Sequence, residues 1–149
     1  MLSIEISNQQ CRLEIDSDRL RRVVEAVLRD AGIADAALSI AVVDDPTIHA
    51  LNRQYLAHDY PTDVLSFTLA QEPGRLEGEV IVSADTALLR ADEFGWPADD
   101  ELLLYAIHGT LHLVGHDDVA ESARAEMRSA EARYLRLVGL GSGRTPGAA

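Results

Sequence analysis

The chain has 149 residues, which is long enough for one domain with a substantial core. Its 47% hydrophobic and 26% charged residues are typical of a globular protein and argue against intrinsic disorder. Thirteen basic and 25 acidic residues give a formal net charge of −12, which excludes nucleic-acid binding through the surface as a whole. Any such role therefore needs a local basic patch or a metal ion.

The sequence also bears on the location of the protein. Its longest unbroken apolar run, Leu102–Ile107, is far too short to cross a membrane. The N-terminal MLSIEISNQQ lacks the basic segment and long apolar stretch of a secretory signal. A single cysteine, Cys11, excludes an internal disulfide and fits a reducing compartment, so we expect a cytoplasmic protein. The composition of 141–149 predicts a disordered tail, which leaves 1–140 as a single domain.

Apolar alternation and helical spacing predict strands and helices in turn along the chain. Turn-forming residues in EPGRLEG, namely Pro73, Gly74 and Gly78, join two of the strands. The expected elements are a strand at 2–7, a helix capped within 16–18 and ending near Ala31, a strand at 38–43, a helix opening at Asp45 and Pro46, strands at 64–69 and 79–83, and helices at 86–94, from Pro97 through Leu111, and at about 119–138.

This order of about four strands and five helices favours an α+β fold with a single mixed sheet. The helix that starts at Pro97 is apolar nearly all round, so we expect it in the middle of the protein.

That central helix carries the residues with the clearest chemistry. His108 and His112 are four positions apart, so both imidazoles project from one face and can bind one metal ion together. Gly115 allows the chain to turn sharply after the helix, and Asp118 follows as a third ligand. Three protein ligands leave a position for water, as in catalytic zinc sites. The sequence therefore predicts a metal site at the helix and the following turn.

Alternatives to this site remain at several positions. His116 and Asp117 are neighbouring rivals of Asp118 as the third ligand. Asp63, at the start of a strand, either orients a metal-binding histidine or bonds local amides. Gly109 stands where helical metalloproteases carry their general base, a glutamate, which argues against a protease. The two histidines themselves could instead be core residues paired with backbone carbonyls.

Three segments resemble one known family. HGTLHLVGHDD, from His108 to Asp118, is similar to the HGxLHLxGYDH signature of the YbeY-type endoribonucleases, also called rRNA maturation factors. LNRQYLAHDYPTDVLSF, from Leu51 to Phe67, resembles the family segment LNxxYRxxDxPTDVLSF. GEVIVSADTA, from Gly78 to Ala87, resembles the GDIxIS strand.

The resemblance implies a metal-dependent endoribonuclease that cleaves single-stranded RNA. It implies roles in maturation of the ends of small-subunit 16S rRNA and in ribosome quality control, so the expected partners are rRNA and the ribosome. It also implies one zinc-type ion held by His108, His112 and Asp118. Nickel, iron and manganese suit similar ligands, so the residues leave the metal open.

The chain departs from the family pattern at two important positions. The third ligand of the family is usually histidine, and here it is Asp118. Leu56 replaces an arginine that is thought to meet the substrate phosphate, and Arg53 or His58 are the residues that can substitute for it. The departure at Leu56 favours a second hypothesis, a ribosome-assembly binding factor with a mainly structural metal. A third hypothesis is another metal-dependent hydrolase, such as a peptidase.

Overall fold

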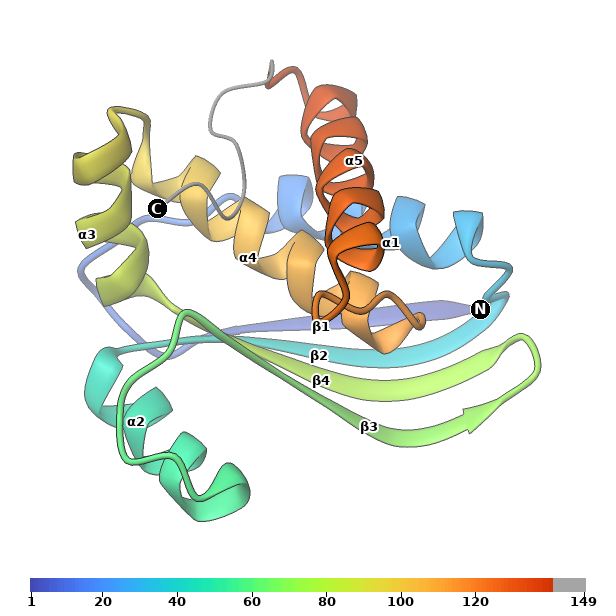
Figure 1. Ribbon diagram of the computed structural model, residues 1–149, viewed down its shortest axis with the longest axis horizontal. Coiled ribbons are helices and arrows are strands. Elements are labelled where there is room, and N and C mark those ends of the chain that lie inside the picture. The colour runs from blue at the N-terminus through green and yellow to red at the C-terminus, as the bar shows by residue number, and fades with distance from the viewer. Residues whose placement is uncertain (141–149) are drawn as a thin grey trace.

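The computed structural model describes residues 1–140, and the prediction of a disordered tail at 141–149 lies outside them. Four strands form one mixed sheet in the order β1-β2-β4-β3, in which β1, β2 and β4 are parallel and β3 is antiparallel to β4 (Figure 1). The predicted α+β class is confirmed. The elements are β1 (Leu2–Asn8), α1 (Ser17–Asp30), β2 (Asp35–Val43), α2 (Asp45–Leu56), β3 (Val64–Glu72), β4 (Arg75–Ser83), α3 (Ala84–Phe94), α4 (Ala98–Leu113) and α5 (Glu121–Leu137).

Helices cover the two faces of the sheet unequally. Helices α1 and α4 pack on one face, and α5 lies across them, whereas α2 lies on the other face (Figure 1). Strand β2 serves both layers, since Ile40 belongs to the larger core under α1 and α4 while Ala41 and Val43 belong to a smaller cluster beside α2. This pattern confirms that the strand predicted at 38–43 is covered on both sides.

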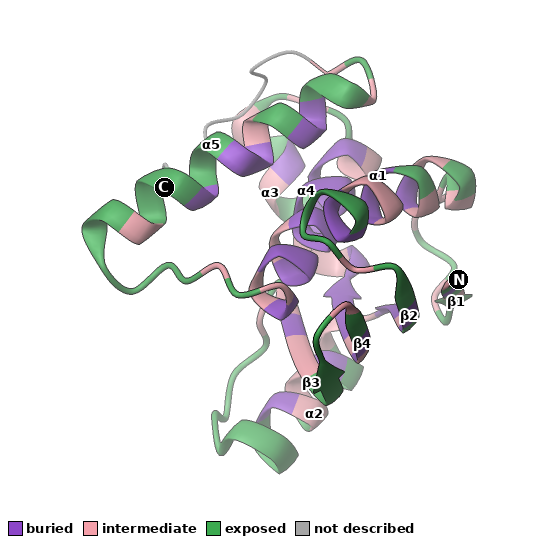
Figure 2. Ribbon diagram, turned by 90° about the vertical axis from the view of Figure 1, so that its right-hand side faces the viewer, coloured by how far each residue is buried: buried purple, intermediate pink, exposed green. Residues whose placement is uncertain are grey.

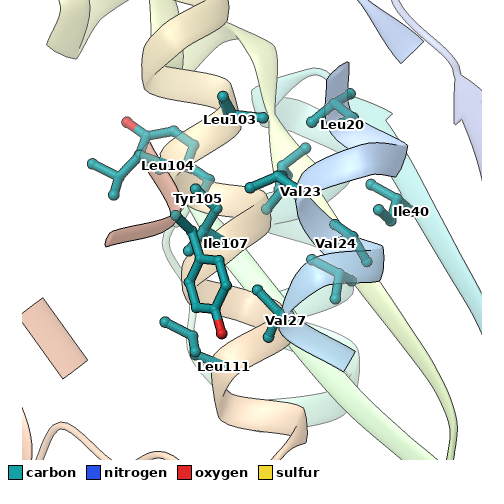
Figure 3. Close-up of a cluster of buried hydrophobic side chains, with 14 of the residues drawn as sticks. Leu20, Val23, Val24, Val27, Ile40, Leu103, Leu104, Tyr105, Ile107 and Leu111 are labelled. Carbon is teal, nitrogen blue, oxygen red and sulfur yellow. The ribbon is translucent and has the colours of Figure 1, made fainter. Parts of the chain in front are cut away.

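Helix α4 is the most deeply buried element. Twelve of its 16 residues are buried, as the hydrophobic run in the sequence predicts, and Figure 2 shows the buried residues concentrated there and on its neighbours. Side chains of α1, including Val23 and Val27, pack against Leu103 and Ile107 of α4 (Figure 3). The few partly exposed residues of α4 are therefore unusual, and two of them are His108 and His112.

Several predicted boundaries were wrong, each for a physical reason. Strand β2 begins at Asp35 instead of 38, since it pairs with β1 on one side and β4 on the other. Residues 64–72 and 75–83 form a longer hairpin than predicted, because the turn uses only Pro73 and Gly74. Gly78 lies inside β4, where a Cβ atom would come within 3.1 Å of Leu113 Cδ1 and of the carbonyl oxygen of Phe67.

Helix starts also differ from the prediction. Asp44, not Asp45, caps α2 by accepting a hydrogen bond from the amide of Thr47. Asp45 accepts hydrogen bonds from the Ser83 and Thr86 hydroxyls, and Ser83 caps α3, which therefore begins at Ala84 instead of 86. The last helix begins at Glu121 instead of 119.

A second glycine, Gly109, sets the distance between α4 and the sheet. A Cβ atom there would lie 2.7 Å from Val80 Cγ1, 2.9 Å from Ser66 Oγ and 3.0 Å from Val64 Cγ2. The two valines are β-branched and have little rotamer freedom to move away. Close packing of α4 on β3 and β4 therefore depends on the missing side chain.

Replacing Gly109 with alanine tests this packing. Helix propensity alone favours alanine by about 1 kcal/mol, but overpacking typically costs about 1–3 kcal/mol, and the 2.7 Å approach makes overpacking the larger effect. We expect Gly109→Ala to lower the free energy of unfolding by about 1–2 kcal/mol in thermal or denaturant unfolding. Val80→Ala should lower the free energy of unfolding less in the Gly109→Ala background than in the unmodified protein. An equal loss of unfolding free energy in both backgrounds would contradict the proposed steric conflict.

Candidate metal centre

His108 and His112 project from one side of α4, one helical turn apart. Their Nε2 atoms are 3.1 Å from each other. The helix ends at Leu113, and Gly115 adopts a positive φ of 104°, which reverses the chain. Asp118 then returns toward the histidines, with Oδ2 3.6 Å from His108 Nε2 and 3.7 Å from His112 Nε2.

These separations fit the coordination of one metal ion. Ligand atoms about 2.0–2.1 Å from a tetrahedral zinc ion lie about 3.3 Å from each other. The three observed distances, 3.1, 3.6 and 3.7 Å, lie on both sides of that value. Two imidazoles and one carboxylate also form a donor set that zinc accepts. This triad of His108, His112 and Asp118 could therefore hold a metal ion.

The rival third ligands lie outside the triad. Among the described residues, the group of converging ligand atoms contains Asp118 and neither His116 nor Asp117. The Asp117 carboxylate accepts a hydrogen bond from the amide of Val119 at 2.7 Å, so it stabilises the turn that brings Asp118 back.

Glu131 is the residue that the sequence interpretation missed. It lies on α5 with only 1% of its surface exposed, and its Oε1 is 2.6 Å from His108 Nδ1. A carboxylate accepts hydrogen bonds, so Nδ1 carries the proton and the Nε2 lone pair faces the other two members of the triad. A signal was available, because Glu131 follows Met127 by four positions and so lies on the buried face of its helix.

The electrostatic environment of His108 is strongly negative. Burial on its own lowers the pKa of His108, but the hydrogen bond to Glu131 and the charge of this carboxylate act in the opposite direction. The charges of Asp63 and Asp118 add to them, so the pKa lies above its usual value. The same charges that favour a protonated imidazole also favour a bound cation.

The other candidate residues make different contacts. Asp63 accepts hydrogen bonds from the amide of Val64 and the hydroxyl of Thr62, so the hydrogen bond to a histidine that was one interpretation of Asp63 is made by Glu131 instead. Arg53 is exposed on α2, with Nη1 3.9 Å from Asp59 Oδ1.

His58 lies in the loop after α2 with its ring stacked on that of Tyr60. Within the described part of the chain, no helix is long and apolar enough to cross a membrane.

A helix-borne pair of histidines with a carboxylate beside it is typical of metal-dependent hydrolases. Comparison with known proteins narrows this class. The family model described as "Endoribonuclease YbeY" matches residues 5–139. The endoribonuclease YbeY of Rhodopirellula baltica is 43% identical over 130 residues, which cover 86% of this chain and 67% of the relative. That of Salinibacter ruber is 39% identical over 143 residues and covers 91% of both chains.

A solved structure agrees with these matches. The solution structure of TM1509 from Thermotoga maritima superposes with a TM-score of 0.62 at 28% identity, covering 91% of this chain and 88% of that one. The chain belongs to the endoribonuclease YbeY family. The resemblance inferred from the three sequence segments is confirmed.

Glu131 provides a test of how the triad is organised. Residues that hydrogen-bond a metal-binding histidine typically contribute 10- to 100-fold to metal affinity. We expect Glu131→Ala to weaken zinc binding by roughly this factor in competition with a chromophoric chelator. Glu131→Gln, whose amide oxygen still accepts the Nδ1 proton, should lose less. Glu126→Ala, an exposed glutamate of the same helix, is the control, and an equal loss there would contradict a specific role for Glu131.

Proposed function

We propose that this chain is a metal-dependent endoribonuclease that cleaves single-stranded RNA during rRNA maturation. The single observation that carries the proposal is the triad, which lies within the residues that the family model matches and converges at distances suited to one ion. The proposed substrate is rRNA of the small ribosomal subunit, where the enzyme processes 16S rRNA ends and takes part in ribosome quality control in the cytoplasm. Family membership supports an RNA substrate, and the proposal extends it to these particular molecules.

Zinc is the proposed metal because His108, His112 and Asp118 supply two nitrogen ligands and one oxygen ligand in a nearly equilateral arrangement. When bound, such an ion lowers the pKa of a coordinated water and polarises a phosphoryl oxygen. Glu131 keeps His108 in the tautomer that offers its Nε2 lone pair. Gly109 supplies no carboxylate where metalloproteases have one, which argues against the peptidase hypothesis.

His108 is a poor choice for testing the site. Glu131 Oε2 is buried and has no hydrogen-bond partner among the described residues, so within this part of the chain His108 is the main partner of a buried carboxylate. Removing one member of a buried charged pair typically costs about 3–5 kcal/mol. A His108→Ala chain would therefore be expected to lose stability together with any metal. His112 and Asp118 provide cleaner tests, because within the described residues the buried carboxylate of Glu131 is hydrogen-bonded to His108 and not to either of them.

The identity of the third ligand is tested at Asp118. We expect Asp118→Ala to lose bound zinc and RNA cleavage, because two imidazoles alone leave the ion weakly held. Asp118→His, which introduces the usual third ligand of the family, should retain both. His116→Ala serves as the matched control and should behave like the unmodified protein. Metal content by elemental analysis and cleavage of a labelled single-stranded RNA are the measurements. Loss of zinc in His116→Ala with retention in Asp118→Ala would contradict the assignment.

A second candidate function is a ribosome-assembly factor that binds RNA without cleaving it. The observation that favours it is Leu56, 44% exposed at the end of α2, where the family has arginine. In the nuclease proposal, Arg53 contacts the phosphate instead, since it lies one turn earlier on the same helix face.

This difference makes a quantitative test possible. Hydrogen bonds to charged groups contribute about 1.5–3 kcal/mol, so Arg53→Ala should slow RNA cleavage by roughly 10- to 100-fold. Adding Leu56→Arg should restore much of the rate, because the new guanidinium occupies the family position. The measurement is the cleavage rate of single-stranded RNA, with a duplex of the same sequence as a negative control substrate. If the unmodified protein and all variants bind RNA without cleaving it, the binding-factor hypothesis replaces the nuclease.

A further inference from the structure

Aromatic rings gather where α2 ends and β3 begins. The rings of His58 and Tyr60 are nearly parallel, with an angle of 11° and centroids 5.3 Å apart. Tyr60 is 53% exposed and His58 is also exposed, so this stacked pair lies at the surface. A second exposed ring, Tyr55, packs edge-on against Phe67 at 5.6 Å. We call the stacked rings of His58 and Tyr60 the ring pair.

The backbone that carries the ring pair is held in place by a buried side chain. Asn52 is only 1% exposed, and its Nδ2 donates a hydrogen bond to the carbonyl oxygen of Tyr60 at 2.9 Å. The backbone carbonyl oxygen of Asn52 accepts hydrogen bonds from the backbone amides of Ala57 and His58. Ala57 itself adopts a positive φ of 58°. The loop is therefore preorganised on α2, and binding would cost little additional ordering.

The segment that carries the ring pair continues into β3, which packs against α4 near His108. Three residues after Tyr60, Asp63 contributes its charge to the environment of His108. Three residues further, Ser66 Oγ donates a hydrogen bond to the carbonyl oxygen of Gly109, which is adjacent to His108 in α4. The ring pair therefore precedes, by a few residues, the part of β3 that packs beside the triad.

Charge limits how this protein can bind RNA. The net charge is −12, and several arginines are already paired with carboxylates. These pairs join Arg12 to Asp85, Arg19 to Asp99 and Asp100, Arg29 to Glu25, and Arg75 to Asp35 and Glu77. Contacts to phosphates therefore supply little general affinity. Base stacking on aromatic rings is the other main source of affinity for single strands, and it does not require positive charge.

We propose that the ring pair of His58 and Tyr60 is a binding site for the nucleobases of single-stranded RNA that flank the cleaved bond. The inference rests on the proposed nuclease function and adds a substrate-binding site outside the metal triad. A base stacks on the outer face of Tyr60, while His58 supports this ring from behind. Because every base has a stacking face, the site tolerates many sequences, and it holds adenine more tightly than uracil.

The test compares Tyr60→Leu with Tyr60→Phe in the zinc-loaded protein. Fluorescence anisotropy at low temperature measures the binding of labelled oligoadenylate, oligouridylate and an abasic strand of equal length, with gels to verify intact probe. Loss of one stacked base typically weakens binding by roughly 5- to 150-fold, so we expect a loss in this range for oligoadenylate with Tyr60→Leu. Tyr60→Phe keeps the ring and should remain within about twofold of the unmodified protein. Leu89→Ala, 61% exposed on α3, is the matched control.

The outcomes separate this site from the nuclease proposal. A large loss with oligoadenylate, a smaller one with oligouridylate and none with the abasic strand supports base stacking, even if the protein cleaves no RNA. In an active enzyme the same variant should raise KM more than it changes kcat. Unchanged oligoadenylate affinity in Tyr60→Leu overturns the ring-pair site while leaving the nuclease intact, and it would make a protein partner the better explanation for the exposed rings. An equal loss with the abasic strand also overturns it.

Discussion

The hydrogen bond between His108 and Glu131 connects the fold to the chemistry. Helix α4 is buried on nearly every side, and an imidazole on such a helix needs a partner. Helix α5 supplies it by placing a carboxylate 2.6 Å from Nδ1. That contact joins α5 to α4 and directs the Nε2 lone pair toward the triad, so the packing of the helices and the geometry of the candidate metal centre share one interaction.

The triad also depends on how α4 ends. The left-handed backbone at Gly115 and the Asp117 side chain return the chain within a few residues, so Asp118 meets the histidines from the following turn. If the triad binds an ion, this geometry lets aspartate take the place of the histidine that the family signature usually has. Its carboxylate is 46% exposed, so a charged ligand at this position loses little hydration.

The sequence predicted the elements whose signals are local. The run of apolar residues in α4, the spacing of His108 and His112, and the glycine that follows were sufficient for the class of fold and the candidate ligands. The spacing from Met127 places Glu131 on the buried face of α5, but its contact with His108 depends on how two distant segments pack, which no local pattern specifies. The start of α2 was misplaced for a similar reason, since Asp45 bonds to residues 38 and 41 positions away instead of capping the helix. The ring pair could not be predicted from the sequence, because the loop that carries it follows a left-handed residue, Ala57, and this conformation is uncommon for alanine.

Gly78 connects a position on the sheet to the metal centre. Leu113, the last residue of α4 and the neighbour of His112, rests against the bare backbone of β4 at this glycine. A methyl group there would press on Leu113 and on the fixed carbonyl of Phe67, so relief of the strain has to come from the end of the helix. Substitution of this glycine would therefore act first on Leu113, which follows His112 of the candidate metal centre. A natural substitution at this position would change activity indirectly, because it would change the distance between α4 and the sheet.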